Sequence, residues 1–159
     1  MNRTDETKIL FTDLDGTLLG DDHKASEGNK RAIEKALDAG HKIVITTGRP
    51  IASARLLAEE LQLTDDGCYV IASNGAVLYD AYNQKVLSEV TFPLSYVRTL
   101  LDSAYEEGLH GHTYSHTNVI CERDTPEIRW YEKAIRVPAI IVDDVTTYLP
   151  YDPVKMILI

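Results

Sequence analysis

The stretch Lys8-Ile-Leu-Phe-Thr-Asp-Leu-Asp-Gly-Thr-Leu18 decides the fold of this chain. Its apolar opening ends abruptly at acidic residues, a pattern typical of a fully buried parallel strand. Because extended residues alternate between two faces, we expect Asp13 and Asp15 to point the same way and Leu14 to point into the core. The glycine that follows permits a sharp turn. The stretch therefore predicts a central strand that carries two carboxylates to one edge of a sheet.

Strands and helices alternate along the first half of the chain. Apolar runs predict strands at 8–12, 42–46 and 68–72, and helical periodicity predicts helices at 26–40 and 50–61. Ser26 is placed to cap the first helix, and Gly40 is placed to close it. This order predicts an α/β fold with a doubly wound, Rossmann-like parallel sheet.

The pattern changes at Asn74-Gly75, where two apolar runs are joined by the strongest short hairpin signal available. A second turn is expected at Asn83-Gln84, before a strand over residues 85–92. The switch near Phe92 indicates a domain boundary. We therefore predict an incomplete α/β core over residues 1–92 and part of a second α/β domain over residues 93–159.

The second region begins with a predicted helix from Pro93 to about Gly108. Strand-like alternation follows from Leu109 to Cys121, and a further helix is expected over 126–135, capped by Asp124 or Thr125. The remaining apolar runs, of strand length, lie at 139–142 and 154–159. The inner face of the first of these helices is expected to comprise Leu94, Val97, Leu100, Leu101 and Ala104.

The chain has 159 residues, with 16 basic and 25 acidic side chains and a net charge of −9. A composition of 44% hydrophobic and 26% charged residues is that of a globular protein and excludes disorder. The acidic balance argues against a nucleic-acid surface, and no apolar run approaches the ~18 residues that span a bilayer. The segment Met1–Thr7 has no apolar signal core, so we expect a cytoplasmic protein in which Cys68 and Cys121 remain reduced thiols.

The two carboxylates at the end of the first strand are a candidate metal site. Open α/β sheets bind their ligands at the carboxyl ends of the strands. Like charges held close together are costly unless a cation lies between them, and Mg²⁺ is the simplest oxygen-loving cation. The alternative is a solvated turn, in which Asp and Gly cap the next element, and such turns are common.

A second polar group, Thr46-Thr47-Gly48-Arg49, ends the second predicted strand at the same edge of the sheet. A threonine hydroxyl beside a glycine amide makes a small oxyanion-binding site that suits a phosphate. Taken alone, this stretch is better interpreted as a β-branched strand end followed by a turn. Taken with the carboxylate pair, it indicates a phosphate held by a metal and by neutral donors.

Together these motifs resemble the haloacid-dehalogenase superfamily of phosphohydrolases, and within it the Cof-like, class IIB sugar-phosphatase branch. The resemblance rests on Asp13–Leu18 after the first strand, on Ile43–Pro50 and on Ile71–Tyr79, and it covers most of residues 8–92. Residues 93–159 more loosely resemble the opening part of the mixed α/β cap domain of these enzymes.

The resemblance implies a role for each residue of the candidate site. Asp13 would be the nucleophile that becomes an aspartyl phosphate, and Asp15 would be the general acid and base. Mg²⁺ would be held by Asp13 and by the backbone carbonyl of Asp15. Thr47 and the amides of Leu14 and Gly48 would bind the phosphate. The substrate would be a small phosphate ester, such as a sugar phosphate.

Three polar assignments near this site stay open. Thr46 adjoins Thr47 and could take its place, although strand alternation allows only one of them. Arg49 could pair with an anionic substrate or with a carboxylate. Asn74 could contact substrate, but an Asn-Gly hairpin explains it equally well and is preferred.

Two further motifs of the family, a lysine and a second acidic cluster, follow the cap in Cof-like enzymes and are not found by residue 159. The sequence therefore looks truncated, and we expect the exposed edge of the core to favour a homo-oligomer or another partner. Lys133 and Asp143-Asp144 imitate the missing motifs, but a cap strand that runs into two loop acids is the preferred interpretation. A catalytically silent fragment is the alternative to an active phosphatase, and a phosphoacceptor domain of response-regulator type ranks below both.

The second region carries two groups of less specific residues. His110 and His112 share a strand face and could chelate a metal, but no third ligand is apparent, so they and His116 are expected to line a surface that faces substrate or solvent. The aromatic side chains are expected to pack in the cap: Trp130, Tyr131, Tyr148 and Tyr151.

Overall fold

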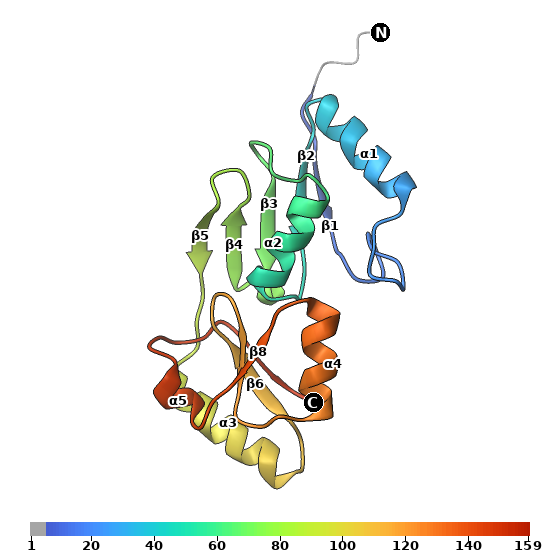
Figure 1. Cartoon of the computed structure of the whole chain (residues 1–159). Coiled ribbons are helices and arrows are strands. Elements are labelled where there is room, and N and C mark those ends of the chain that lie inside the picture. The colour runs from blue at the N-terminus through green and yellow to red at the C-terminus, as the bar shows by residue number, and fades with distance from the viewer. Residues whose placement is uncertain (1–5) are drawn as a thin grey trace. The chain divides into compact units, whose positions relative to one another are not determined.

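The structure, a computed structural model, describes residues 6–159 and forms two compact units (Figure 1). Unit 1 comprises residues 1–48 and 54–88, and unit 2 comprises residues 49–53 and 89–159. The expectation for the segment Met1–Thr7 rests mostly on residues that lie outside the described part. None of the helices in the described part of the chain is long and apolar enough to span a membrane.

Unit 1 is built around a five-stranded sheet in the order β1-β2-β3-β4-β5. Strands β1, β2 and β3 are parallel, and β3 pairs antiparallel with β4. The predicted α/β class is confirmed. The elements are β1 (Ile9–Thr12), α1 (Glu27–Asp38), β2 (Lys42–Thr46), α2 (Ile51–Glu60), β3 (Tyr69–Ala72), the 3₁₀ turn Ser73–Gly75, β4 (Val77–Asp80) and β5 (Lys85–Glu89).

The ends of α1 follow the local sequence. The Ser26 hydroxyl accepts a hydrogen bond from the Asn29 amide at 3.0 Å, which satisfies one of the amides left open at a helix start. At the other end, Gly40 has a φ of 78°, and the amide of His41 donates to the carbonyl of Ala36. Glycine adopts this left-handed conformation readily, so it closes the helix. Both predicted helix ends are confirmed.

The prediction that the first strand is fully buried is wrong. Ile9, Leu10 and Phe11 are 58%, 56% and 60% exposed, whereas the apolar residues of β2 are at most 4% exposed. The cause is position in the sheet: β1 is an edge strand that pairs with β2 alone, while β2 has a neighbour on each side. The apolar pattern correctly predicted a parallel strand, but it does not determine whether other elements pack over that strand.

The hairpin between β3 and β4 is confirmed, but its turn differs from the two-residue type that Asn-Gly favours. Ser73, Asn74 and Gly75 all have positive φ, at 52°, 58° and 94°. The second predicted turn is also present, because Asp80 accepts a hydrogen bond from the Asn83 amide at 2.9 Å. Strand β5 then ends at Glu89 rather than at residue 92.

Unit 2 has a four-stranded sheet in the order β8-β7-β6-β9. Strand β6 is antiparallel to both of its neighbours, and β7 is parallel to β8. Val119 and Cys121 of β7 pack into one apolar cluster, and Ile120 packs into another, so both faces of this sheet are covered. The elements are α3 (Leu94–Glu106), β6 (Gly111–Tyr114), β7 (Val119–Cys121), α4 (Pro126–Ile135), β8 (Ala139–Ile141), α5 (Val145–Tyr148) and β9 (Met156–Leu158).

Several packing predictions for unit 2 are wrong. Leu100 was expected on the inner face of α3 but is 39% exposed, while Val97, Leu101 and Ala104 are buried as predicted. Trp130 was expected to pack in the cap but is 67% exposed. The tyrosines of α5 and the segment after it, Tyr148 and Tyr151, are also exposed.

Candidate active site

The loop after β1 exposes two carboxylates on either side of a buried leucine. Asp13 and Asp15 are exposed, and Leu14 is fully buried, as the expected alternation requires. The Leu14 carbonyl accepts hydrogen bonds from the amides of Leu19 at 2.8 Å and Thr17 at 3.3 Å. The backbone therefore turns sharply around a buried anchor while the acids remain in water.

Hydroxyl and imidazole groups surround these acids. The Thr17 hydroxyl donates to Oδ2 of Asp13 at 3.4 Å, and the Thr12 hydroxyl donates to the carbonyl of Asp13 at 3.0 Å. His23 places its Nδ1 3.6 Å from Oδ1 of Asp15. His23 lies in an irregular turn, where neither helical nor strand periodicity in the sequence distinguishes a functional residue.

The Thr47-Gly48 segment leaves the same edge of the sheet as the two acids. Strands β1 and β2 are parallel, and Thr12, the last residue of β1, is paired with Ile45. The buried Thr47 donates its amide to the carbonyl of Ile71 at 2.8 Å, and its own carbonyl accepts from the Asn74 amide at 3.2 Å. The ends of β1, β2 and β3 are thus joined by backbone contacts at the edge where the sequence predicts the site.

Asn74 does more than close its hairpin. Besides the backbone bond to Thr47, its side chain lies directly against Gly48, since a Cβ added at Gly48 would lie 2.7 Å from Asn74 Oδ1. A side chain at position 48 would therefore require the Asn74 side chain to move. The turn of the hairpin therefore packs directly against Thr47-Gly48, the predicted oxyanion-binding segment.

Arg49 belongs to the segment that is grouped with unit 2. It is buried, and its Nη1 donates to the Ser53 hydroxyl at 3.1 Å and to the carbonyl of Ala134 at 3.3 Å. These two acceptors are neutral oxygens. These two hydrogen bonds hold the guanidinium within unit 2.

The donor set at the end of β1 suits a hard cation. Both acids are exposed oxygen donors, and Mg²⁺ in proteins is bound by one or two carboxylates with several waters. Across residues 6–159, no group of three or more His, Cys, Asp or Glu side chains is arranged to hold a metal ion. The two exposed carboxylates fit a sparsely liganded Mg²⁺.

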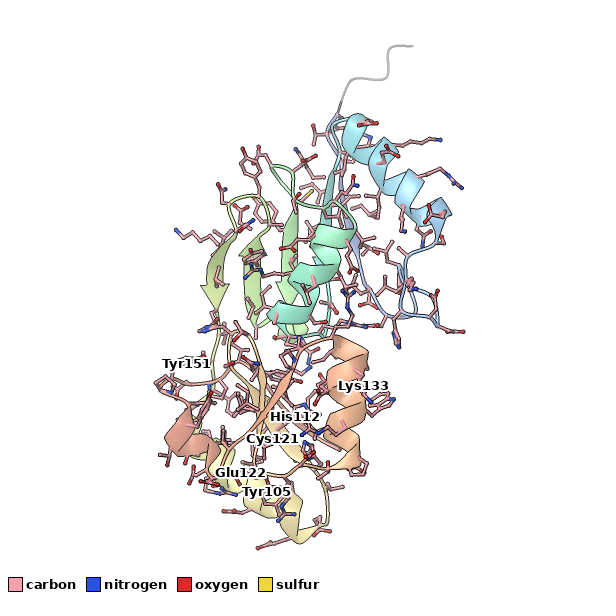
Figure 2. All side chains as sticks on the ribbon, viewed as in Figure 1. Tyr105, His112, Cys121, Glu122, Lys133 and Tyr151 are labelled. Carbon is pink, nitrogen blue, oxygen red and sulfur yellow. The ribbon has the colours of Figure 1, made fainter. Side chains whose placement is uncertain are left out.

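His110 and His112 lie in the core of unit 2 rather than on a surface that faces substrate or solvent, so the prediction is wrong for these two, whereas His116 is exposed. His110 and His112 are 4% and 0% exposed. Nε2 of His112 lies 3.1 Å from the Tyr114 hydroxyl, which lies 2.6 Å from that of Tyr131. Burial lowers the pKa of His112 to about 3. The imidazole is therefore neutral, and it belongs to a buried polar chain with Tyr114 and Tyr131. Figure 2 marks the position of His112 within unit 2.

Of the two acids after β8, Asp144 has a structural role and Asp143 is exposed. Asp144 caps α5, because its Oδ1 accepts from the amide of Thr147 at 2.9 Å and from the hydroxyl of Thr146 at 2.6 Å. Lys133 is exposed on α4. The cysteines, Cys68 and Cys121, are buried free thiols as predicted, and burial raises the pKa of Cys121 to about 11.

Comparison with known sequences identifies relatives of this chain. Residues 10–157 match the haloacid dehalogenase-like hydrolase family. YxeH, a proposed phosphatase of Bacillus subtilis, is 35% identical over 129 residues, which are 80% of this chain and 48% of that protein. The 5-amino-6-(5-phospho-D-ribitylamino)uracil phosphatase YcsE of the same organism is 40% identical over 76 residues, which are 48% of this chain and 29% of YcsE.

Solved structures share the fold. A haloacid dehalogenase-like hydrolase from Bacteroides thetaiotaomicron matches with a TM-score of 0.87 and 22% identity, over 96% of this chain and 57% of that one. A subclass IIB sugar phosphatase of the same superfamily matches with a TM-score of 0.74 and 23% identity, over 95% of this chain and 57% of that one. The chain spans about half the length of the proteins that it matches. Because the family match extends over nearly the whole sequence, the chain belongs to the haloacid dehalogenase-like hydrolases.

Proposed function

We propose that this chain carries the nucleophile-bearing part of a Mg²⁺-dependent phosphatase that hydrolyses a small phosphorylated metabolite, such as a sugar phosphate. One observation carries the proposal: exposed Asp13 and Asp15 flank a buried Leu14 at the sheet edge where Thr47-Gly48 also ends. The names of the relatives support the chemical class, since they include phosphatases of a phosphoribityl compound and of pyridoxal phosphate.

In this mechanism an Asp13 oxygen attacks the phosphorus atom. A bond forms between Asp13 and phosphorus while the ester bond to the leaving alkoxide breaks, and Asp15 donates a proton to that alkoxide. Asp15 then accepts a proton from the water that attacks the aspartyl phosphate, which releases inorganic phosphate and restores Asp13. Mg²⁺ held by the Asp13 carboxylate and the Asp15 carbonyl would neutralise charge on the transferring group.

The residues around the two acids have supporting tasks. The Thr47 hydroxyl and the amides of Leu14 and Gly48 would hold the phosphate oxygens. The hydrogen bond from Thr17 to Asp13 leaves the second carboxylate oxygen of Asp13 available for attack. Because the acids are exposed, a substrate can reach them from solvent.

The competing function is that of a catalytically silent fragment or assembly partner. It is favoured by the absence, in the described residues, of a side-chain cluster like the second acidic motif that the family resemblance implies. Such a chain would retain the fold of unit 1 and bind phosphate weakly, but it would not turn over substrate.

Hydrolysis of p-nitrophenyl phosphate with Mg²⁺ distinguishes the two functions. We expect wild-type turnover to exceed that of Asp13→Asn, with Asp21→Asn as a matched control, since Asp21 is an exposed acid of the neighbouring turn. Removal of Mg²⁺ with a chelator should abolish the difference between wild type and Asp13→Asn. Equal rates for wild type and Asp13→Asn would contradict the phosphatase and favour the silent chain.

A further inference from the structure

The turn that follows β3 is a strained part of unit 1. Ser73 and Asn74 adopt left-handed φ values of 52° and 58°, and Gly75 follows at 94°. A non-glycine residue in this conformation costs about 1 kcal/mol or more, and such strain persists only where the surroundings impose it. Ser73 is also 4% exposed, and its hydroxyl has no hydrogen-bond partner among the described residues. Something other than local preference therefore holds this turn.

The turn holds the peptide group between Thr47 and Gly48. The carbonyl of that peptide accepts from the Asn74 amide at 3.2 Å, on the β3 side of β2. No peptide bond in the described chain is cis, so the amide of the same peptide points to the opposite side. Strand β1 lies on that side, since β2 is between β1 and β3. The bond from Asn74 thus turns the Gly48 amide toward the end of the strand that carries Asp13 and Asp15.

The side chain of Asn74 also lies against Gly48. Its Oδ1 occupies the space in which a residue at position 48 would carry Cβ, at 2.7 Å from that position. Gly48 has no positive φ, so its backbone conformation suits other residues equally well. The steric restriction at this position therefore comes from the Asn74 side chain and not from the local backbone.

We propose that Asn74 is a positioning residue that orients the Gly48 amide for an oxyanion. The proposal rests on the proposed phosphatase function and deepens it. Asn74 acts through Gly48 rather than by touching substrate: its backbone amide donates to the carbonyl of the Thr47–Gly48 peptide, and its side chain lies against Gly48. The strain of the turn is the cost of bringing Asn74 against Gly48.

A double-mutant cycle in the full chain tests this coupling. Inorganic phosphate is titrated into ¹⁵N-labelled protein, and the Gly48 amide resonance and the phosphate affinity are measured for wild type, Asn74→Ala, Gly48→Ala and the double variant. We expect Asn74→Ala to shift the Gly48 resonance, and each single variant to weaken phosphate binding about tenfold, the scale of one charge-assisted hydrogen bond. In the double variant the alanine at 48 occupies the space vacated at 74, so affinity should recover relative to Gly48→Ala.

Asn83→Ala is the matched control, because Asn83 stabilises the other turn of β4 through Asp80 and does not contact Gly48. It should leave the Gly48 resonance and the phosphate affinity as in wild type. The proposal is overturned if Asn74→Ala behaves like Asn83→Ala, or if the two changes at 48 and 74 are additive. If wild type does not bind phosphate, the proposed function fails, whereas the Gly48 resonance without phosphate still decides whether Asn74 orients this amide.

Discussion

Two pairs of ionisable side chains in this protein have the same spacing and opposite environments. Asp13 and Asp15 flank Leu14 at the end of β1, and both are exposed. His110 and His112 flank Gly111 at the start of β6, and both are buried. Each pair follows the alternation of extended residues, and each was a candidate for metal binding in the sequence.

The difference follows from where each strand lies in its sheet. Strand β1 is an edge, and its acids stand beyond the last strand pairing, where water and ligands reach them. Strand β6 lies between β7 and β9, and the ring of Tyr131 from α4 is centred 4.7 Å from that of His112. A polar pair can bind an external ligand only at a strand end open to solvent. The same pair within a covered sheet is confined to internal hydrogen bonds.

The exposed pair should be essential for activity and nearly irrelevant for stability. We expect Asp15→Asn to lower turnover of a phosphate ester by about 10²- to 10⁴-fold, the usual contribution of a general acid and base. The free energy of unfolding should change by no more than about 0.5 kcal/mol, as for most exposed positions. Steady-state kinetics and urea denaturation measure both quantities, and a large loss of stability with little loss of turnover would reverse the comparison.

The buried pair should instead make unit 2 sensitive to acid. Burial lowers the pKa of His112 to about 3, whereas its ordinary value is 6.5. Between these pH values the unfolded chain binds a proton that the folded chain does not, so the free energy of unfolding falls as the pH drops. His112→Gln removes this titratable group. The substitution should therefore reduce the dependence of the free energy of unfolding on pH by up to about 1.4 kcal/mol per pH unit.

The pH experiment compares wild type with the glutamine variant, because other groups also respond to acid. Hydrogen bonds from Arg129 and from Thr146 lower the pKa values of Asp124 and Asp144, and both carboxyls lose stabilising contacts as they protonate. These effects are common to both proteins and cancel in the difference. The free energy of unfolding is measured by urea denaturation at several pH values between 7 and 4. If it varies with pH equally in the two proteins, His112 is not the acid-sensitive group.

The two neighbouring threonines sharpen the description of the exposed site. Thr47 is buried beside Gly48, while Thr46 is the last residue of β2. We expect Thr47→Val to weaken binding of inorganic phosphate about tenfold, through loss of one hydroxyl donor to an anion. Thr46→Val should have a smaller effect. Isothermal titration calorimetry of both variants decides the assignment. If Thr46→Val weakens phosphate binding more than Thr47→Val does, the phosphate contact belongs to Thr46.

The smallest expected effect concerns the uncovered strand itself. Three consecutive apolar side chains of β1 are more than half exposed, and an open apolar edge favours association with another chain. We expect the wild-type chain to self-associate at high concentration and Phe11→Lys to shift it toward monomer. Light scattering after size exclusion measures the change, with Tyr82→Lys as a control at another exposed aromatic. A monomeric wild type would contradict this expectation.

Much of the fold could be predicted from the sequence because its signals are local. The cap at Ser26, the glycine that closes α1 and the Asn-Gly hairpin each depend on residues within a few positions. Burial could not be predicted in the same way, because Phe11 and Trp130 are apolar but have little packed against them. The short α5, of four residues, has too few turns to show a helical period.

The candidate site was predicted only in part for the same reason. Asp13, Asp15 and Thr47 stand out because acidic and hydroxyl residues end apolar strands. The contact between Asn74 and Gly48 joins two loops distant in sequence, and only the pairing of β2 with β3 brings them together. His23 reaches Asp15 through an irregular turn that no pattern marks.

The exposed indole of Trp130 on α4 can serve as a fluorescence probe of one of the two units. Trp130 is the only tryptophan of the chain, and it belongs to unit 2. Its fluorescence emission therefore reports on unit 2 and does not report on events confined to β1. Combining this emission with far-ultraviolet circular dichroism would show whether the two units melt as one cooperative block or one after the other.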